Sequence, residues 1–402
     1  MEDKRMLHNY AKVLVRRGLN VKTGQQVYLE CPAEGAELAA MIVEEVADAG
    51  GGRTIVRLKE EAVEEALLRQ GYAEASDDEM RFLEGCAKAG AAFLRIETVN
   101  VGNRAGISAE LLSKKAKALR HERVLYQKLS GGVQACIANL PTRSWAEAVY
   151  PSLSPEEGLK RLWEDVFSCT RSDQEDPIAA WDKYIADTQK RKDILNQKAF
   201  KRIRYMGPGT NLTVRLHQNG RWQGGNMELS DGTIYVPNIP TEEIFHAPTS
   251  DSAQGVVSAT LPLNLEGVLV KDMVLEFQKG RVMSVSASEG IDVLFKLLAT
   301  DDGAARLGEV ALIDQGSPMA SMKKIFYSSL YDENASCHMA VGLAAGPKPP
   351  TEEKMRAEGL NVSSIHVDFM VGSDELSVYG ENKNGEWEPI LEKGRFTGEY
   401  KF

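Results

Sequence analysis

Residues 27–59, VYLECPAEGAELAAMIVEEVADAGGGRTIVRLK, indicate the fold class of the first part of the chain. Apolar residues gather in two short runs, Val27–Cys31 and Thr54–Leu58, which have the pattern of buried strands, while Glu34–Ala49 repeats apolar residues at helical spacing. The glycines Gly50–Gly52 follow this helix and precede a strand, the reverse of the order that a phosphate-binding loop requires, so we interpret them as a helix C-cap. Two strands joined through a helix of this length predict a parallel sheet.

The same alternation continues on both sides of this stretch. Tyr10–Leu19 has a helical pattern, Ala91–Ile96 has the pattern of a third strand, and residues 154–200 are mainly helical. We therefore expect an N-terminal parallel α/β domain over residues 1–200.

From about Ile203 the pattern changes to short β-like runs separated by glycine and proline. Two helices are expected within this part, at Gly290–Leu298 and Ala304–Val310, and strands return at Ile365–Met370. We expect a mixed α+β C-terminal domain over residues 201–402, which makes the whole chain an α/β protein. Its length of 402 residues also favours two domains.

The charge balance limits the classes of partner. With 58 acidic and 48 basic residues the net charge is −10, which argues against nucleic acid or an anionic membrane. The basic run Lys190–Arg204 is interrupted by apolar residues at helical spacing, as on the solvated face of an amphipathic helix. No stretch is apolar enough for a signal peptide or a membrane span, and the five cysteines form no C-x-x-C pair. We expect a protein of the reducing cytoplasm.

The segment Ile365–Met370 places a histidine and an aspartate two residues apart. In a strand His366 and Asp368 share one face, while the apolar residues between and beside them point to the other. An imidazole and a carboxylate that converge from an apolar strand suit a divalent metal. The alternative is a histidine held by a carboxylate neighbour, or a strand that is merely half exposed.

A second histidine follows the acidic start of the segment Asp332–His338. We expect this segment to turn into a helix and to direct both Glu333 and His338 inward. The alternative is a simple helix cap by Asp332. Cys337 could act as a thiol nucleophile, but adjacent residues diverge on a helix or a strand, which disfavours a pair with His338.

Two further carboxylates lie in apolar surroundings, Glu309 within Leu307–Leu312 and Glu243 directly after Glu242. A buried carboxylate is costly unless it is paired or bound to metal. Two alternatives stay open: Glu242 and Glu243 in the first turn of a helix, and Glu309 on the exposed face of an amphipathic helix. The candidates together supply four carboxylates and two imidazoles, which is what a pair of metals about 3.5–4 Å apart requires.

Four segments, in this order, closely resemble the motifs of the thermophilic-type metalloaminopeptidases, the aminopeptidase T and aminopeptidase S family. They are Pro237–Glu243, Leu307–Leu312, Tyr331–His338 and Ser364–Met370. Tyr10-Ala11 near the N-terminus and Pro141-Thr142 in the centre also fit, so the similarity runs over nearly the whole chain.

The resemblance implies a co-catalytic pair of divalent metals, usually zinc or cobalt, with manganese or magnesium as further candidates. It also implies the release of N-terminal residues from short peptides by a homodimer. The metal ligands that it implies, with Glu309 as the bridge, are Glu243, Glu309, Glu333, His338, His366 and Asp368. In the mechanism of such a site a nearby carboxylate passes a proton to the leaving amine, and Glu242 is our candidate for this role.

The chain departs from the family pattern in three places. Ala345 stands where the family usually has a tyrosine, seven residues after the position of His338, that is thought to stabilise the tetrahedral intermediate. Thr260–Leu263 has leucine where the family tends to have lysine, and His246 replaces a residue that is more often threonine. Two other hypotheses therefore stay open: an amidase or deacylase that uses the same metal pair, and a weakened homologue that only binds metal or peptide.

Overall fold

The computed structural model describes residues 2–72, 76–99, 132–265, 268–346, 349 and 351–402. By their internal contacts the residues form two compact units: Met1–Lys183 with Asn226–Pro240, and Tyr184–Gly225 with Thr241–Phe402. The chain passes from one unit to the other at 183/184, 225/226 and 240/241. The domains expected from the sequence, 1–200 and 201–402, stay a prediction, because compactness does not show that either part folds alone.

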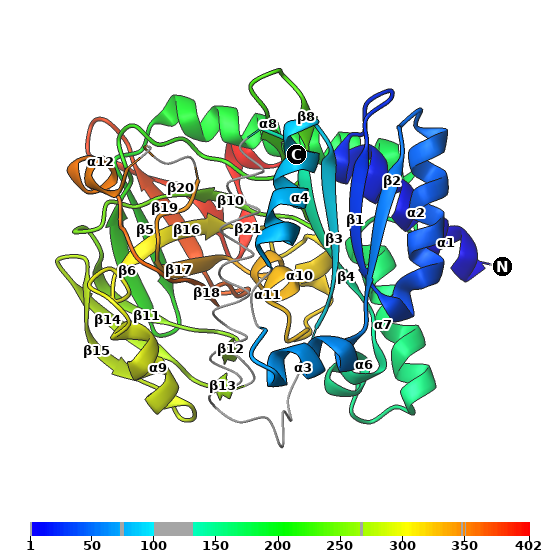
Figure 1. Ribbon diagram of the computed structural model, residues 1–402. Helices are drawn as coiled ribbons and strands as arrows, with labels where there is room; N and C mark the ends of the chain where they lie inside the picture. The colour runs from blue at the N-terminus through cyan, green and yellow to red at the C-terminus, as the bar shows by residue number, and fades with distance from the viewer. Residues whose placement is uncertain (1, 73–75, 100–131, 266–267, 347–348, 350) are drawn as a thin grey trace. The chain divides into compact units, whose positions relative to one another are not determined.

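A five-stranded sheet forms the centre of the first unit (Figure 1). All its neighbouring strands run parallel, in the order β2-β1-β3-β4-β9, which confirms the parallel sheet predicted for the N-terminal part. The strands are β1 (Val27–Pro32), β2 (Thr54–Lys59), β3 (Ala92–Thr98), β4 (Ala135–Leu140) and β9 (Asn238–Ile239). Between β1 and β2, helix α2 (Ala36–Asp48) is followed by Gly50 with a φ of 77°, the left-handed conformation that the C-cap prediction requires.

Helices cover both faces of this parallel sheet: α1 and α2 lie along one face and α4 along the other (Figure 1). On the α4 side, the rings of Phe82 and Tyr28 meet edge to face with their centroids 6.2 Å apart. Besides α2, the α-helices that begin in the described part of this unit are α1 (Glu2–Val13), α3 (Glu61–Arg69), α4 (Asp77–Lys88), α6 (Arg143–Val149), α7 (Pro155–Cys169) and α8 (Pro177–Lys198). The last two helices confirm the helical region expected over residues 154–200. A small hairpin, β7 (Met227–Glu228) and β8 (Ile234–Tyr235), belongs to the same unit.

An eight-stranded antiparallel sheet, in the order β15-β14-β11-β6-β5-β19-β20-β21, forms one layer of the second unit. Its strands are β5 (Arg202–Gly207), β6 (Thr210–Arg215), β11 (Gln254–Ser258), β14 (Val274–Gln278), β15 (Arg281–Ser286), β19 (Ser377–Glu381), β20 (Trp387–Glu392) and β21 (Arg395–Phe396). The second unit also contains an antiparallel strand pair, β12 (Leu263–Leu265) with β13 (Val268–Val270), and helix α9 (Ile291–Leu298).

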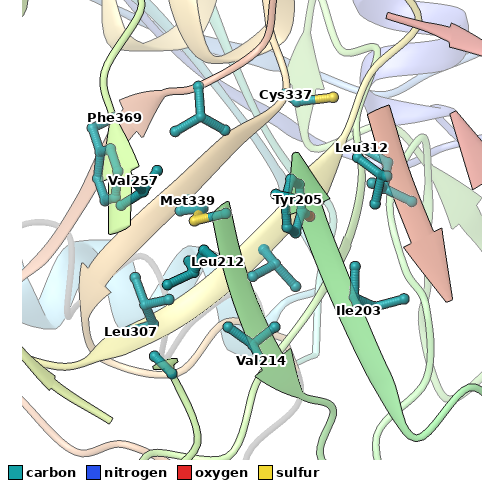
Figure 2. Close-up of a cluster of buried hydrophobic side chains, with 14 of the residues drawn as sticks. Ile203, Tyr205, Leu212, Val214, Val257, Leu307, Leu312, Cys337, Met339 and Phe369 are labelled. Atoms are coloured by element: carbon teal, nitrogen blue, oxygen red, sulfur yellow. The ribbon is translucent and has the colours of Figure 1, made fainter. Parts of the chain in front are cut away.

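A second antiparallel sheet, in the order β10-β16-β17-β18, packs against this layer. Its strands are β10 (Ile244–His246), β16 (Leu307–Leu312), β17 (His338–Gly342) and β18 (His366–Met370). Figure 2 shows the shared core, where Tyr205 and Leu212 of the larger sheet lie against Leu307 and Met339 of the smaller one. The remaining helices are α10 (Pro318–Ser321), α11 (Ser329–Asp332), the 3-10 turn Glu333–Ala335 and α12 (Glu352–Ala357). The mixed α+β architecture expected for the C-terminal part is confirmed.

One expected helix, Ala304–Val310, is wrong. Residues 307–312 form strand β16, in which all six residues are buried. The strand lies between β10 and β17, and both its faces are covered, so its sequence shows no alternation of apolar and polar residues. Such a run cannot be distinguished from a buried helix by its period. The neighbouring expectations are confirmed, since Gly290–Leu298 contains α9 and Ile365–Met370 contains β18.

Across the part of the chain that the structure describes, no helix has the length and apolar character needed to cross a membrane. All five cysteines are buried and free, in agreement with the prediction that they form no disulfide framework.

Trp181→Ala is expected to destabilise the first unit by about 3–5 kcal/mol. The Trp181 indole is fully buried, and its Nε1–H donates a hydrogen bond of 2.8 Å to the carbonyl of Thr170. Calorimetric unfolding of wild type and variant measures the loss. Trp387→Ala is the control, because that side chain is 37% exposed and its removal should cost below about 1 kcal/mol. Equal losses in the two variants would contradict the argument from burial.

Candidate metal centre

The two faces of the sheet β10-β16-β17-β18 differ in chemistry. Directly paired residues of antiparallel strands share a face. Apolar pairs such as Met339 with Phe369 lie on the face that packs in the core of the second unit. The opposite face, called the polar face from here on, carries Glu309, His338, His366 and Asp368. The predicted alternation in β18 is confirmed, because Val367 packs against the core while His366 and Asp368 lie on the polar face.

A β-bulge at Gly308 determines which face Glu309 occupies. Leu307 pairs with Val341 and Glu309 pairs with Ala340, so two steps along β16 match one step along β17. In a regular strand Glu309 would share the apolar face of Leu307, because residues two apart point the same way. The bulge turns the carboxylate to the polar face instead, a known use of bulges beside functional sites.

Glu309 belongs to two groups of side chains that could each hold a cation. The first group is Glu243, Glu309 and His338, the second is Glu309, His366 and Asp368, and within each group the ligand atoms lie within 4.8 Å of one another. Oε1 of Glu309 lies 3.6 Å from Nε2 of His338, and Oε2 lies 3.2 Å from Nε2 of His366. Nε2 of His338 is also 3.2 Å from Glu243, and Nε2 of His366 is 3.5 Å from Asp368. Each oxygen of Glu309 therefore faces a different imidazole.

Backbone carbonyls orient both imidazole rings. Nδ1 of His338 lies 2.8 Å from the carbonyl oxygen of Glu333, and Nδ1 of His366 lies 2.7 Å from that of Leu343. A carbonyl oxygen only accepts hydrogen bonds, so Nδ1 carries a proton and Nε2 is directed to the carboxylates, where it can bind a cation when the ring is neutral. Metal-bound histidines are held by this kind of contact, and a set of imidazole and carboxylate donors suits zinc and similar divalent ions. The residues present fit a divalent metal.

Burial makes the charges of this cluster costly. The pKa of Glu333 lies well above its ordinary value because of burial and then because of the neighbouring carboxylates of Asp368 and Glu243. Burial also opposes a charge on His338, but hydrogen bonds to Glu243 and Glu309 raise the pKa of this imidazole well above its ordinary value. Without cations, protons compensate the buried carboxylates. Divalent ions would neutralise the carboxylates in place of these protons, so metal binding is expected to release protons.

The residues Glu242, Glu243 and Glu333 lie outside the strands. The helical turn considered for Glu242 and Glu243 is wrong, because strand β10 follows them directly. The expected turn into a helix at Asp332 is also wrong: α11 ends at this residue, the 3-10 turn follows, and β17 begins at His338. Asp332 accepts a hydrogen bond of 2.7 Å from the N–H of Phe326 instead. Glu242 and Glu333 belong to neither of the two groups that share Glu309.

Two of the departures from the family pattern, Ala345 and His246, supply none of the donors in these groups. The N–H of Ala345 donates a hydrogen bond of 3.0 Å to the carbonyl of Gly308, so the chain after β17 is joined to the bulge. His246 pairs with Val310 and shares its apolar face, where burial lowers the pKa of the imidazole to about 4. Neither residue belongs to the groups that contain Glu309.

Sequence reasoning missed two residues that shape this site, Gly308 and Asn334. A glycine inside an apolar strand pattern is a signal for a bulge, and this signal was present at Gly308. Asn334 is fully buried and contacts both acidic segments, but nothing in its local sequence indicates those partners.

Gly308→Ala is expected to reduce metal binding at least about 10-fold, as changes beside metal ligands commonly do. A Cβ at this position would lie 2.2 Å from the carbonyl oxygen of Leu343, so the bulge that directs Glu309 cannot persist unchanged. Metal content after dialysis, measured by mass spectrometry, tests this. Gly85→Ala is the control, because a Cβ there meets nothing within 4 Å. A Gly308→Ala protein with the wild-type metal content would show that the bulge does not control the position of Glu309.

Comparisons with known proteins identify the family to which the chain is similar. The family described as "Thermophilic metalloprotease (M29)" matches residues 3–396. Aminopeptidase 2 of Geobacillus stearothermophilus is 35% identical over 404 residues, which cover 98% of both chains. Aminopeptidase T of Thermus thermophilus is 36% identical over 403 residues, 98% of this chain and 99% of that one. The solved structure of wild-type AmpT from Thermus thermophilus matches with a TM-score of 0.90 at 32% identity, covering 98% of this chain and all of that one. The resemblance predicted from four motifs is confirmed.

Proposed function

Because this chain belongs to the thermophilic metalloprotease (M29) family and is a metalloaminopeptidase, we propose that it works with two divalent ions bridged by Glu309. The proposed ligands are Glu243, Glu309, Glu333, His338, His366 and Asp368.

The single observation that supports two ions best is the position of Glu309 between two imidazoles. Its two carboxylate oxygens lie 3.6 Å and 3.2 Å from the Nε2 atoms of His338 and His366. One carboxylate common to two separate groups of donors is the arrangement that a bridged ion pair needs. A single ion would leave one group of buried donors without a cation, at a considerable cost in desolvation.

Bound at these residues, two divalent ions would supply Lewis-acid polarisation of a peptide carbonyl and lower the pKa of water. The chain's own residues supply the rest. The carbonyls of Glu333 and Leu343 hold the rings of His338 and His366 with Nε2 directed to the carboxylates. Burial shields the donors of the polar face unequally from competing water: His338 is only 1% exposed, whereas the side chains of His366 and Asp368 are 28% and 17% exposed.

A carboxylate outside the two groups is needed to move a proton to the leaving amine. Glu242 stays our candidate, because it lies next to Glu243 in the chain but belongs to neither group. Glu333 also lies outside the groups, yet burial and the carboxylates around it raise its pKa. We assign it as a ligand, because a carboxylate in that surrounding gains most from a neighbouring cation.

The substrate, location and oligomeric state that we propose are based on the similarity to the family. The relatives are named as aminopeptidases, and we propose that this enzyme releases N-terminal residues from short peptides as a cytoplasmic homodimer. Zinc or cobalt is the proposed metal, with manganese or magnesium as further candidates. The side chain of Ala345 provides no hydrogen-bond donor in place of the family's tyrosine, so we expect a slower peptidase rather than an inactive one.

A substrate panel tests the reaction. We expect hydrolysis of aminoacyl amides with a free α-amine by protein loaded with zinc, cobalt or manganese, and no hydrolysis of the same amides after N-acetylation. Faster hydrolysis of the acetylated compounds would identify a deacylase, and metal binding without hydrolysis of either series would identify a weakened homologue.

Glu309→Gln is expected to lower kcat more than about 100-fold and to reduce the metal content below two ions per chain. The amide keeps the size of the side chain but removes the charge that both groups share. Steady-state kinetics together with metal analysis measure both effects. Glu45→Gln is the control, a buried carboxylate of the first unit that pairs with Arg16 and should affect stability alone. A Glu309→Gln enzyme with two ions and near wild-type turnover would exclude the bridging role.

Chelation is expected to abolish activity and to lower the melting temperature of the second unit. Removal of the ions leaves Glu243, Glu309, Glu333 and Asp368 close together without cations, and their repulsion and desolvation favour unfolding. Calorimetry before and after dialysis against a chelator, then after zinc or cobalt is restored, measures the shift. An unchanged melting temperature in protein shown to have lost its metal would contradict the proposed compensation of charge.

A further inference from the structure

The two groups that share Glu309 differ in the structural elements from which their side chains come. In the group of Glu309, His366 and Asp368 every side chain comes from a strand, β16 or β18, and the ladder of the sheet fixes their spacing. In the other group only Glu309 and His338 come from strands. Glu243 precedes β10, and the nearby Glu333 lies in the 3-10 turn, so the sheet alone does not position these two carboxylates.

Asn334 connects the two acidic segments that lie outside the strands. It is 0% exposed, and its Oδ1 accepts a hydrogen bond of 2.7 Å from the backbone N–H of Glu242, 92 residues away in the chain. Its Nδ2 donates to the carbonyl of Leu330 at 2.9 Å and to the carboxylate of Glu333 at 3.4 Å. One amide therefore uses both its acceptor and its two donors to hold the segments of Glu243 and Glu333 together.

We propose that Asn334 is a positioning residue for one of the two ions alone, the ion of the group that contains Glu243 and His338. This inference rests on the proposed function, since it presupposes two ions. The other ion depends on strand positions, whereas the hydrogen bonds of Asn334 run to Glu242, Leu330 and Glu333, so the two ions should respond differently to the same substitution.

The amide chemistry explains why asparagine is needed. An aspartate has the same size and could still accept the hydrogen bond from the N–H of Glu242. It has no donor for the carbonyl of Leu330, and its charge would repel the carboxylate of Glu333. A serine would be too short to reach both segments. Either change should let the two acidic segments separate while the sheet stays intact.

The experiment is a calorimetric titration of metal-free protein with zinc or cobalt ions, combined with metal analysis. In Asn334→Asp and Asn334→Ser we expect one ion to bind with the wild-type affinity and the other to bind about 10–100-fold more weakly. Asp368→Asn should weaken the complementary ion, and the double variant Asn334→Asp with Asp368→Asn should weaken both.

The matched control is Asn361→Asp, because Asn361 is also a buried asparagine whose Nδ2 donates to two backbone carbonyls, those of Gly303 and Gly342. It carries the same change of charge and should lower the melting temperature without separating the two affinities. Equal weakening of both ions in the Asn334 variants, or the same pattern in Asn361→Asp, would overturn the inference while leaving the proposed function in place. A wild-type protein that binds fewer than two ions would overturn both.

Discussion

The repulsion among the carboxylates clustered at the polar face and beside it is the constraint on which the rest of the second unit depends. Glu243, Glu309, Glu333 and Asp368 lie close together around two imidazoles, of which His338 is buried together with Glu309. Such a cluster is unfavourable in a folded chain unless positive charge compensates it, either as protons on the histidines and carboxyls or as bound cations. The sheets, the bulge and the buried asparagine all serve to hold these groups close together against that repulsion.

The antiparallel sheet β10-β16-β17-β18 places apolar side chains on one face and the metal-ligand candidates on the other. Its apolar face packs into the core shown in Figure 2, and that burial supplies the stabilisation that the polar face lacks. Small residues of β17 leave room for these donors: Ala340 lies between Glu309 of β16 and Asp368 of β18, and Gly342 pairs with His366. The bulge at Gly308 then adds one donor, Glu309, from a strand whose regular alternation would have buried it in the core.

Local pattern was sufficient to predict part of this site from the sequence and insufficient for the rest. His366 and Asp368 were predicted to share a face, because alternation in a strand depends only on neighbouring residues. Glu309 was expected on a helix, since an apolar run that is buried on both faces has no period, and the register of β16 against β17 is not a local property. The contact of Asn334 with the N–H of Glu242 spans 92 residues, and no spacing rule gives such a pair.

The hydrogen bond made by the backbone of Ala345 does not depend on its side chain, so alanine can replace the tyrosine of the family without loss of this contact. The N–H of Ala345 donates to the carbonyl of Gly308, and any residue except proline can provide that donor. The side chain at this position is therefore not needed to anchor the bulge or to direct Glu309. Replacement of a phenol by a methyl group removes a hydrogen-bond donor from the neighbourhood but leaves the hydrogen bond to the bulge intact. In this fold, a substitution of the side chain at position 345 can therefore affect the reaction rate without affecting metal binding, whereas a substitution at Gly308 is expected to affect metal binding.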